Sequence, residues 1–338
     1  MKLVRIGLAL ILGLILIGGA FAAGGRDAGA DGVRTINLVG GTMLPEGHVY
    51  WRTVQKFEER MRVNYTGPHR INFSLHHSGT LGSERDATEL MIQGTAVDFY
   101  VISPAWIATW ERTAPIIDAP FLFRDLDHWK KVLEQGVLKP IEDAVLRVGL
   151  RFIGYGGGST RHLISRIPAH TDADFPRIRL RVQGSPIHQR AFSAAGFQAT
   201  PLDYMEVYNA IATGVLDALE NEPAGLLSMR FFEVAPYYVL TAHQIQTRIL
   251  AFSERRFQSF PRDVQEAILK SGAEAAAWHR ETEIAEEEGQ IAQMVRENGL
   301  RVIPFDNTTM HRRAMPAVEE FAREIGALPI VQAIQNVR

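Results

Sequence analysis

The sequence predicts an α/β protein built from two lobes. From Thr35 onward, short β-rich runs alternate with helical patterns, which is the rhythm of an α/β fold. The chain has 338 residues, of which 46% are hydrophobic, so it is long enough for two domains that each bury a core. One segment, 261–298, is helical almost throughout and would extend roughly 55 Å, longer than one domain. Such a helix must leave one domain and brace another.

The first third of the chain predicts three strands, at 36–39, 71–76 and 99–102. Four apolar residues spaced at i, i+4, i+7 and i+11 predict a helix between the first two strands: Tyr50, Val54, Phe57 and Met61. Ser83 is an expected N-cap, because Asp86 follows three residues later, and its helix should run to about Gln93. Pro104 begins a further helix after the third strand.

The middle of the chain continues this alternation. The apolar segment 118–123 is predicted to be a loop, because Pro120 cannot donate to a strand ladder. Two helices follow, beginning at about Leu126 and Leu138. The next strand, 151–155, should stop at the triple glycine 156–158, which suits either a hinge or the close approach of a ligand.

The second half predicts three more strands, at 178–182, 215–219 and 250–253. Pro186 opens a helix after the first of these strands, and a short helix at 204–213 ends at Gly214. The long helix begins at Pro261 and ends at Asn298, before a glycine. The predicted architecture is therefore two α/β lobes joined by several chain crossings and by this helix.

Composition and charge exclude several classes of function. The 36 Lys and Arg against 38 Asp and Glu give a formal net charge of -2, without the basic excess that nucleic-acid binding requires. The chain has no cysteine, which excludes disulfides, thiolate nucleophiles, iron–sulfur clusters, Cys-based zinc sites and a lipid-modified N-terminal cysteine. We expect a soluble globular protein that does not bind nucleic acid.

The N-terminus is typical of an exported protein. Lys2 and Arg5 precede an uncharged run, 6–21, that ends in small residues. This predicts a cleavable signal peptide over residues 1–22, followed by a flexible Gly-rich leader at 23–33. The alternative is a permanent membrane anchor, although the run is short for a span of roughly 20 residues.

Motifs for catalysis and for metal binding are missing from the sequence. His76 and His77 would point to opposite faces of a strand, and no ligand-spaced His pair occurs. There is no G-x-S-x-G and no Walker lysine, and Arg161 stands where a dinucleotide motif would need its third glycine. The acidic run 286–288 is typical of a solvated helix face. We therefore predict no catalytic residue, no metal site and no cofactor.

Two arginines stand beside Gly-rich or apolar strand ends. Arg161 follows the triple glycine, and Arg181 ends the run 178–181. A guanidinium can grip a carboxylate through two parallel hydrogen bonds, which lysine cannot reproduce. These residues are candidates for an anion site, and the alternative is that both form surface ion pairs.

Several sequence blocks occur in an order that is more specific than any one of them. They are S-G-T-L-G-S-E-R at 78–85, G-T-A-V-D at 94–98, D-A-P-F-L-F-R-D at 118–125, R-H-L at 161–163, L-R-V at 180–182, A-G-F-Q-A-T-P at 195–201, T-G-V-L-D at 213–217 and E-N at 220–221. In these blocks the chain closely resembles TRAP transporter solute-binding proteins of the DctP family.

This resemblance implies a two-lobed periplasmic binding protein of the class II type, with a hinge, that captures a small organic acid. By the same resemblance, Arg181 clamps the ligand carboxylate, Arg161 lies near that group as a second arginine, and Asn221 completes the anion site. Glu84 is expected to contact ligand hydroxyls or amines, and Tyr204 to pack over the ligand.

A weaker alignment extends the implied site. It places Thr42, Ser103 and Gln246 on other loops that line the cleft. Trp106 either narrows the pocket or belongs to the core. Gly184 stands where some sugar-acid binders present a polar side chain, so that contact is lost here.

The resemblance also implies partners, a location and lobe boundaries. Lobe I should comprise 34–158 and 247–286, and lobe II 159–246 and 287–338. The protein is expected to be periplasmic and monomeric, and to hand its ligand to the membrane subunits of an ion-driven TRAP permease. The alternatives are a secreted enzyme or a protein-binding scaffold on the same frame, although Glu84, the only promising catalytic acid, lacks an evident partner.

Overall fold

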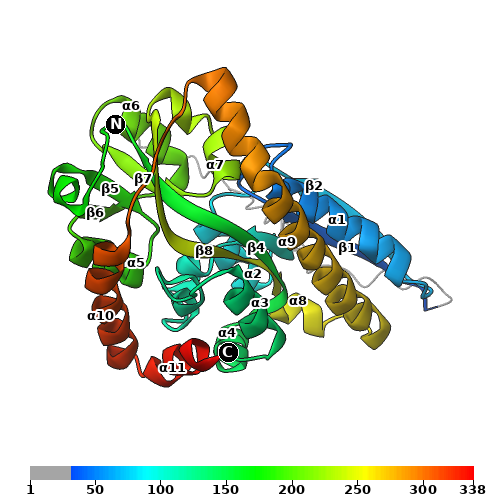
Figure 1. Cartoon of the computed structure of the whole chain (residues 1–338). Coiled ribbons are helices and arrows are strands. Elements are labelled where there is room, and N and C mark those ends of the chain that lie inside the picture. The colour runs from blue at the N-terminus through cyan, green and yellow to red at the C-terminus, as the bar shows by residue number, and fades with distance from the viewer. Residues whose placement is uncertain (1–31) are drawn as a thin grey trace, which may run out of the picture.

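A computed structural model describes residues 32–338, and this part of the chain forms one mixed sheet of nine strands (Figure 1). The predicted signal peptide lies outside the described residues, as does the leader except for 32–33. β9 (Arg301–Ile303) pairs with β8, and the other strands lie in the order β2 (Arg70–His76), β1 (Thr35–Gly41), β3 (Phe99–Ile102), β8 (Tyr237–Ser253), β4 (Leu150–Ser165), β7 (Ala218–Asn221), β5 (Arg179–Val182) and β6 (Gln198–Pro201).

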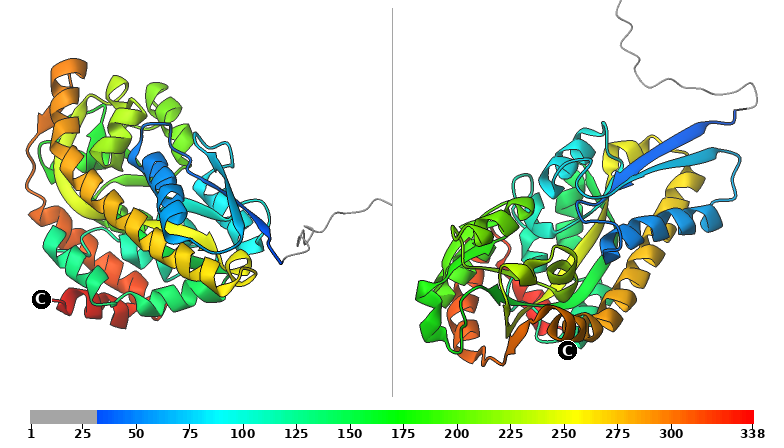
Figure 2. Two further views of the ribbon diagram at one scale, coloured as in Figure 1. Left: turned by 90° about the vertical axis from the view of Figure 1, so that its right-hand side faces the viewer. Right: turned by 90° about the horizontal axis from the view of Figure 1, so that it is seen from above.

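Helices cover both faces of this sheet (Figure 2). They are α1 (Val49–Asn64), α2 (Glu84–Gln93), α3 (Leu126–Glu134), α4 (Lys139–Arg147), α5 (Pro186–Ala195), α6 (Val207–Ala212), α7 (Pro223–Ser228), α8 (Glu254–Gln258), α9 (Arg262–Asn298), α10 (Thr308–Glu324) and α11 (Leu328–Asn336). None of those within residues 32–338 combines the length and the apolar character that crossing a bilayer would need.

The two lobes share the long strands β4 and β8. The first lobe contains the parallel strands β2, β1 and β3, and the second contains the parallel strands β6, β5 and β7. Between them, β4 and β8 have 16 and 17 residues and pair antiparallel, so that both strands pass from one lobe into the other.

The predicted end of a strand at the triple glycine is wrong. β4 continues through 156–158, where its register with β8 shifts between Gly157 and Thr160. Gly157 and Gly158 adopt φ angles of +98° and +107°, which bend the strand in a bulge without ending it. A Cβ atom on Gly157 would lie 2.3 Å from a backbone oxygen of β8, so glycine is required there.

The predicted long helix is confirmed as α9, which begins after Pro261 and ends at Gly299 in the left-handed conformation. α9 packs against α1 and against β4, and farther along its length it contacts α7 of the second lobe (Figure 2). Its contact with β4 is close, because a Cβ on Gly154 would lie 2.5 Å from the Cβ of Ala276. α9 therefore braces both lobes.

Local patterns in the first lobe are also confirmed. The four spaced apolar residues of α1 are buried on one face, and Ser83 and Asp86 form the capping box of α2. Pro104 begins a short 3-10 helix, 104–107, which does not continue into an α-helix. β7 begins at Ala218, three residues after its predicted start, and β8 begins at Tyr237, thirteen residues before its predicted start at Leu250. The elements that were not predicted are β6, β9, α7, α8, α10 and α11.

Candidate ligand-binding site

A cavity of about 320 Å³ lies between the two lobes. It sits beyond the carboxyl ends of β1, β3, β5 and β7, where parallel strands of α/β proteins commonly present ligand-binding residues. Its lining residues come from both lobes: Met43, Leu44, Tyr50, Glu84, Ser103, Trp106, Arg161, Arg181, Gln183, Tyr204, Asn221, Glu222 and Arg248. Seven of the nine predicted site residues are among them.

Arg181 on β5 is buried and lacks a carboxylate partner. Its Nε donates to the carbonyl of Leu202 at 2.9 Å, and its guanidinium lies 5.4 Å from the centroid of the Tyr204 ring. The two terminal nitrogens make no hydrogen bond to any residue within 32–338. Burial lowers the pKa of Arg181. A buried guanidinium in this state is a strong attractor for an anion.

Arg161 on β4 is occupied by other side chains. Its Nε donates to Glu220 at 2.6 Å, and its Nη1 donates to Glu222 at 2.5 Å and to Gln246 at 2.7 Å. Burial alone would lower the pKa of Arg161, but the two carboxylates raise it. Arg161 lines the cavity as predicted, yet its charge is compensated by protein groups.

Arg248 on β8 lines the cavity and was missed by the sequence analysis. Its Nε donates to the hydroxyl of Tyr50, and its Nη1 donates to Asp118 at 3.2 Å and to the carbonyl of Thr247 at 2.8 Å. No hydrogen bond joins its Nη2 to the described part of the chain. A signal was present, since Arg248 is the only Lys, Arg, Asp or Glu residue in the 17 residues of β8.

Acceptor groups face these arginines from the first lobe. The backbone N–H of Ser103 donates to Glu84 Oε2 at 2.9 Å, and the Ser103 hydroxyl bonds to Asp118 at 3.1 Å and to Gln183 at 2.7 Å. Burial raises the pKa of Glu84 to about 7. Glu84 can therefore accept or donate a hydrogen bond near neutral pH.

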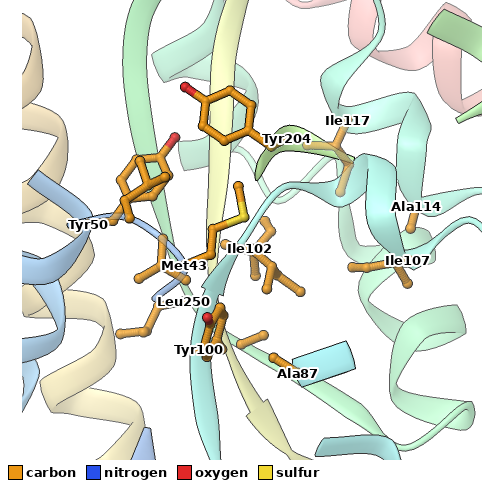
Figure 3. Close-up of a cluster of buried hydrophobic side chains, with 14 of the residues drawn as sticks. Met43, Tyr50, Ala87, Tyr100, Ile102, Ile107, Ala114, Ile117, Tyr204 and Leu250 are labelled. Atoms are coloured by element: carbon orange, nitrogen blue, oxygen red, sulfur yellow. The ribbon is translucent and has the colours of Figure 1, made fainter. Parts of the chain in front are cut away.

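Aromatic rings and an apolar side chain complete the wall. Figure 3 shows Met43 directed toward the rings of Tyr50 and Tyr204, at one end of a larger buried cluster. The Tyr204 hydroxyl accepts from Asn221 Nδ2 at 2.7 Å, which fixes both side chains. Trp106 is half-buried and lines the cavity, so it is not solely a core residue.

The structure does not bring Thr42 and Gln246 to the cavity wall. The Thr42 hydroxyl accepts from the N–H of Leu44 at 3.2 Å and so shapes the turn that follows β1. Gln246 lies on β8 and not on a loop, where its oxygen accepts from Arg161 and its nitrogen donates to Glu283 at 2.6 Å. Both residues support lining residues from behind.

The cavity as a whole favours an anion. Three arginines line it: Arg161 is paired with Glu220 and Glu222, and Arg248 with Asp118, so within residues 32–338 Arg181 alone among them has no ion pair and is the position where an anion is favoured. No group of three or more His, Asp or Glu residues between 32 and 338 is arranged to hold a metal ion.

Comparison with known proteins places the chain in a family. The model of bacterial extracellular solute-binding protein family 7, DctP, matches residues 40–324. A solute-binding protein of Sulfitobacter sp. (strain NAS-14.1) is 38% identical over 322 residues, which are 95% of this chain and 97% of that protein. The 2,3-diketo-L-gulonate-binding periplasmic protein YiaO of Escherichia coli (strain K12) is 27% identical over 77% of each chain.

Solved structures give the same result. A TRAP periplasmic solute-binding protein from Sulfitobacter sp. NAS-14.1 with bound α-D-taluronate has a TM-score of 0.85 and 39% identity, covering 89% of this chain and 97% of that one. One from Roseobacter denitrificans with bound β-D-glucuronate has a TM-score of 0.83 and 26% identity, covering 89% and 100%. The chain belongs to the DctP family, family 7 of the bacterial extracellular solute-binding proteins, and is a solute-binding protein of a TRAP transporter.

Proposed function

We propose that this protein captures a hexuronate or a closely related sugar acid between its lobes and delivers it to a TRAP permease. The observation that carries this proposal is Arg181, whose buried guanidinium has two terminal nitrogens at the cavity that bond to no residue within 32–338. The bound taluronate and glucuronate of the two solved relatives support a sugar acid as the ligand.

In this proposal, Arg181 binds the ligand carboxylate through two parallel hydrogen bonds while Asn221 and Tyr204 hold the same end of the ligand. Sugar hydroxyls donate as well as accept, so they need partners of both kinds. Glu84 supplies acceptor oxygens, and the free nitrogen of Arg248 supplies a donor. The aromatic rings cover the apolar faces of the sugar.

Binding is coupled to closure of the lobes. Arg181 belongs to the second lobe and Glu84 to the first, so a ligand held by both favours the closed state. We propose that the hinge lies in β4 and β8 at the bulge after Gly157, which agrees with lobes made of 34–158 with 247–286 and of 159–246 with 287–338.

We further propose that the ligand leaves chemically unchanged, since the lining residues include no side-chain pair with an evident nucleophile and base. The mature protein is proposed to be a periplasmic monomer, released by cleavage after residue 22. Recovering the bound acid after long incubation and comparing its NMR spectrum with that of fresh acid tests for turnover.

Calorimetry with matched acids and neutral sugars tests the main proposal. D-taluronate, D-glucuronate and D-galacturonate are compared with D-glucose and D-galactose, which lack the carboxylate. A neutral sugar should bind at least about 100-fold more weakly than the best acid, because it loses two charge-assisted hydrogen bonds of about 1.5–3 kcal/mol each. Equal affinity for a neutral hexose, or no binding of any of these acids, would contradict the proposal.

A further inference from the structure

A second, larger pocket of about 850 Å³ adjoins the ligand cavity. Several of its lining residues are exposed, among them Arg85, Thr109 and Gln189, so we call it the outer pocket. Within residues 32–338, Trp106 is the only residue that lines both the cavity and the outer pocket.

The walls of the two pockets are continuous. Three chain segments pass from one to the other, and each gives successive residues to the cavity and the outer pocket: Glu84 and Arg85, Gln183 and Gly184, and Tyr204 and Asp203. The first segment belongs to the first lobe and the other two to the second. The pockets therefore form one channel between the lobes, interrupted at the indole of Trp106.

The backbone of Trp106 is held in a short helix, and its indole packs against the opposite side of the channel. The backbone N–H of Trp106 donates to the carbonyl of Ser103 at 3.2 Å, within the short helix 104–107 that Ser103 caps. Across the channel, a Cβ on Gly184 would lie 2.3 Å from Cζ3 of Trp106. The indole thus occupies the space in which any larger residue at 184 would place its side chain.

The outer pocket is equipped to bind a sugar ring. Ser185 is 1% exposed and lines this pocket, and its buried hydroxyl has no hydrogen-bond partner within residues 32–338. Ser185 precedes α5 and its side chain makes no cap hydrogen bond to that helix, so a ligand that reached the hydroxyl would supply its missing partner. Arg85 and Gln189 add donors, and Asp203 adds an acceptor. Such a mixture beside an aromatic ring matches the hydroxyls and the apolar face of a pyranose.

We infer that Trp106, held against Gly184, is the partition that sets the length of the ligand, and that the outer pocket is a subsite for a second sugar ring. The inference rests on the proposed function, since it assumes that the cavity holds one sugar-acid ring. The intact protein selects single-ring acids, and loss of the indole opens the outer pocket to two-ring acids.

The test compares one-ring and two-ring acids by calorimetry. D-glucuronate and D-galacturonate are the one-ring probes, and digalacturonate is the two-ring probe. In the unmodified protein, digalacturonate should bind at least 100-fold more weakly than the better one-ring acid. Trp106→Ala should reduce this ratio to 10-fold or less. Trp110→Ala is the matched control and should leave the ratio unchanged, because Trp110 is also half-buried but lines neither pocket.

Two further variants make the outcome decisive. Adding Ser185→Ala to Trp106→Ala should weaken digalacturonate binding about three- to tenfold while leaving one-ring binding unchanged. Trp106→Leu replaces the alanine variant if that variant does not fold. Two outcomes, each with the one-ring acids still binding, would refute the role of Trp106 as a partition and leave the proposed function standing. In the first, digalacturonate binds the unmodified protein as well as the one-ring acids do. In the second, folded Trp106 variants still reject digalacturonate. If no one-ring acid binds the unmodified protein, the proposed function is refuted, and the inference about Trp106 is refuted with it.

Discussion

Replacement of Arg181 should separate ligand affinity from protein stability. Arg181→Lys keeps the charge but offers one donor direction where the guanidinium offers two parallel bonds. Losing one charge-assisted bond of about 1.5–3 kcal/mol weakens acid binding by roughly 10- to 150-fold. Arg181→Met loses both bonds, about 3–6 kcal/mol, so binding weakens by roughly 10² to 10⁴.

The same methionine variant should not destabilise the ligand-free protein. Arg181 has no carboxylate partner within hydrogen-bond distance, and burial already lowers its pKa, so the folded state bears a desolvation cost for this charge. We expect the free energy of unfolding of Arg181→Met to equal or exceed that of the unmodified protein.

Calorimetry with the hexuronate that binds most tightly gives the affinities, and urea unfolding without ligand gives the stabilities. Arg181→Lys serves as the charge-matched variant in both measurements. If Arg181→Met binds the acid within about threefold of the unmodified protein, the carboxylate is held elsewhere in the cavity. A large loss of stability would show that Arg181 is a structural residue.

Three further variants test the buried charges and the hinge. Burial raises the pKa of Glu84 from 4.5 to about 7, so the folded state binds this proton more tightly than the unfolded chain. The free energy of unfolding that this proton contributes is therefore lost as the pH rises from 4.5 to 7. Urea unfolding of Glu84→Gln at pH 5 and pH 8 should show a fall in stability that is smaller than in the unmodified protein by up to about 3 kcal/mol. Arg161→Met leaves two buried carboxylates unpaired and should lower the free energy of unfolding by about 3–5 kcal/mol. Gly157→Ala forces a Cβ to within 2.3 Å of a backbone oxygen at a φ of +98°, and should cost about 1–3 kcal/mol in urea unfolding.

Matched substitutions isolate these effects. Arg179→Met removes an arginine that also pairs with a carboxylate, but its side chain is 43% exposed and Asp217 still accepts from the backbone N–H of residue 179, so it should cost less than Arg161→Met. Gly47→Ala changes another glycine with positive φ, +93°, where an added Cβ has no neighbour within 4 Å, so it should cost less than Gly157→Ala. A pH dependence of stability that is identical with and without Glu84 would refute the assignment of its raised pKa.

The sequence predicted the elements of the fold whose causes are local. The face of α1, the capping box of α2 and the ends of α9 each depend on residues within a few positions of one another. The path of β4 depends on its pairing with β8, where Thr247 pairs with Gly157 from 90 residues later in the chain, so the sequence alone led us to predict that the strand ends at the glycines. Only the pairing of β4 with β8 shows that these glycines bend the strand without ending it.

In the candidate site, too, the residues with a local sequence signal were predicted and the contacts between distant residues were not. Arg161 and Arg181 were found because one follows the triple glycine and the other ends the run 178–181, but nothing local distinguishes a paired guanidinium from an unpaired one. The partners of Arg161 are 59 and 61 residues away in sequence. Arg248 was overlooked because the strand was predicted only at 250–253, whereas β8 begins at Tyr237 and carries Arg248 to the cavity at the crossing between lobes.

Arg161 and Arg181 differ in whether a protein carboxylate neutralises their charge, and this difference affects how the lobes respond to a ligand. Pairing of Arg161 with Glu220 and Glu222 keeps one positive charge neutralised whether or not a ligand is present. Within residues 32–338 Arg181 has no direct ion pair, so closing the lobes without an anion leaves its charge desolvated, and the more distant carboxylates of Glu220 and Asp203 offset that cost only in part. Under the proposed function, the empty protein is therefore expected to favour the open state, and an acid reverses that preference by the free energy with which it prefers the closed site. A neutral sugar of the same shape would leave the desolvation cost in place. We therefore expect closure, and with it delivery to the permease, to depend on the charge of the ligand.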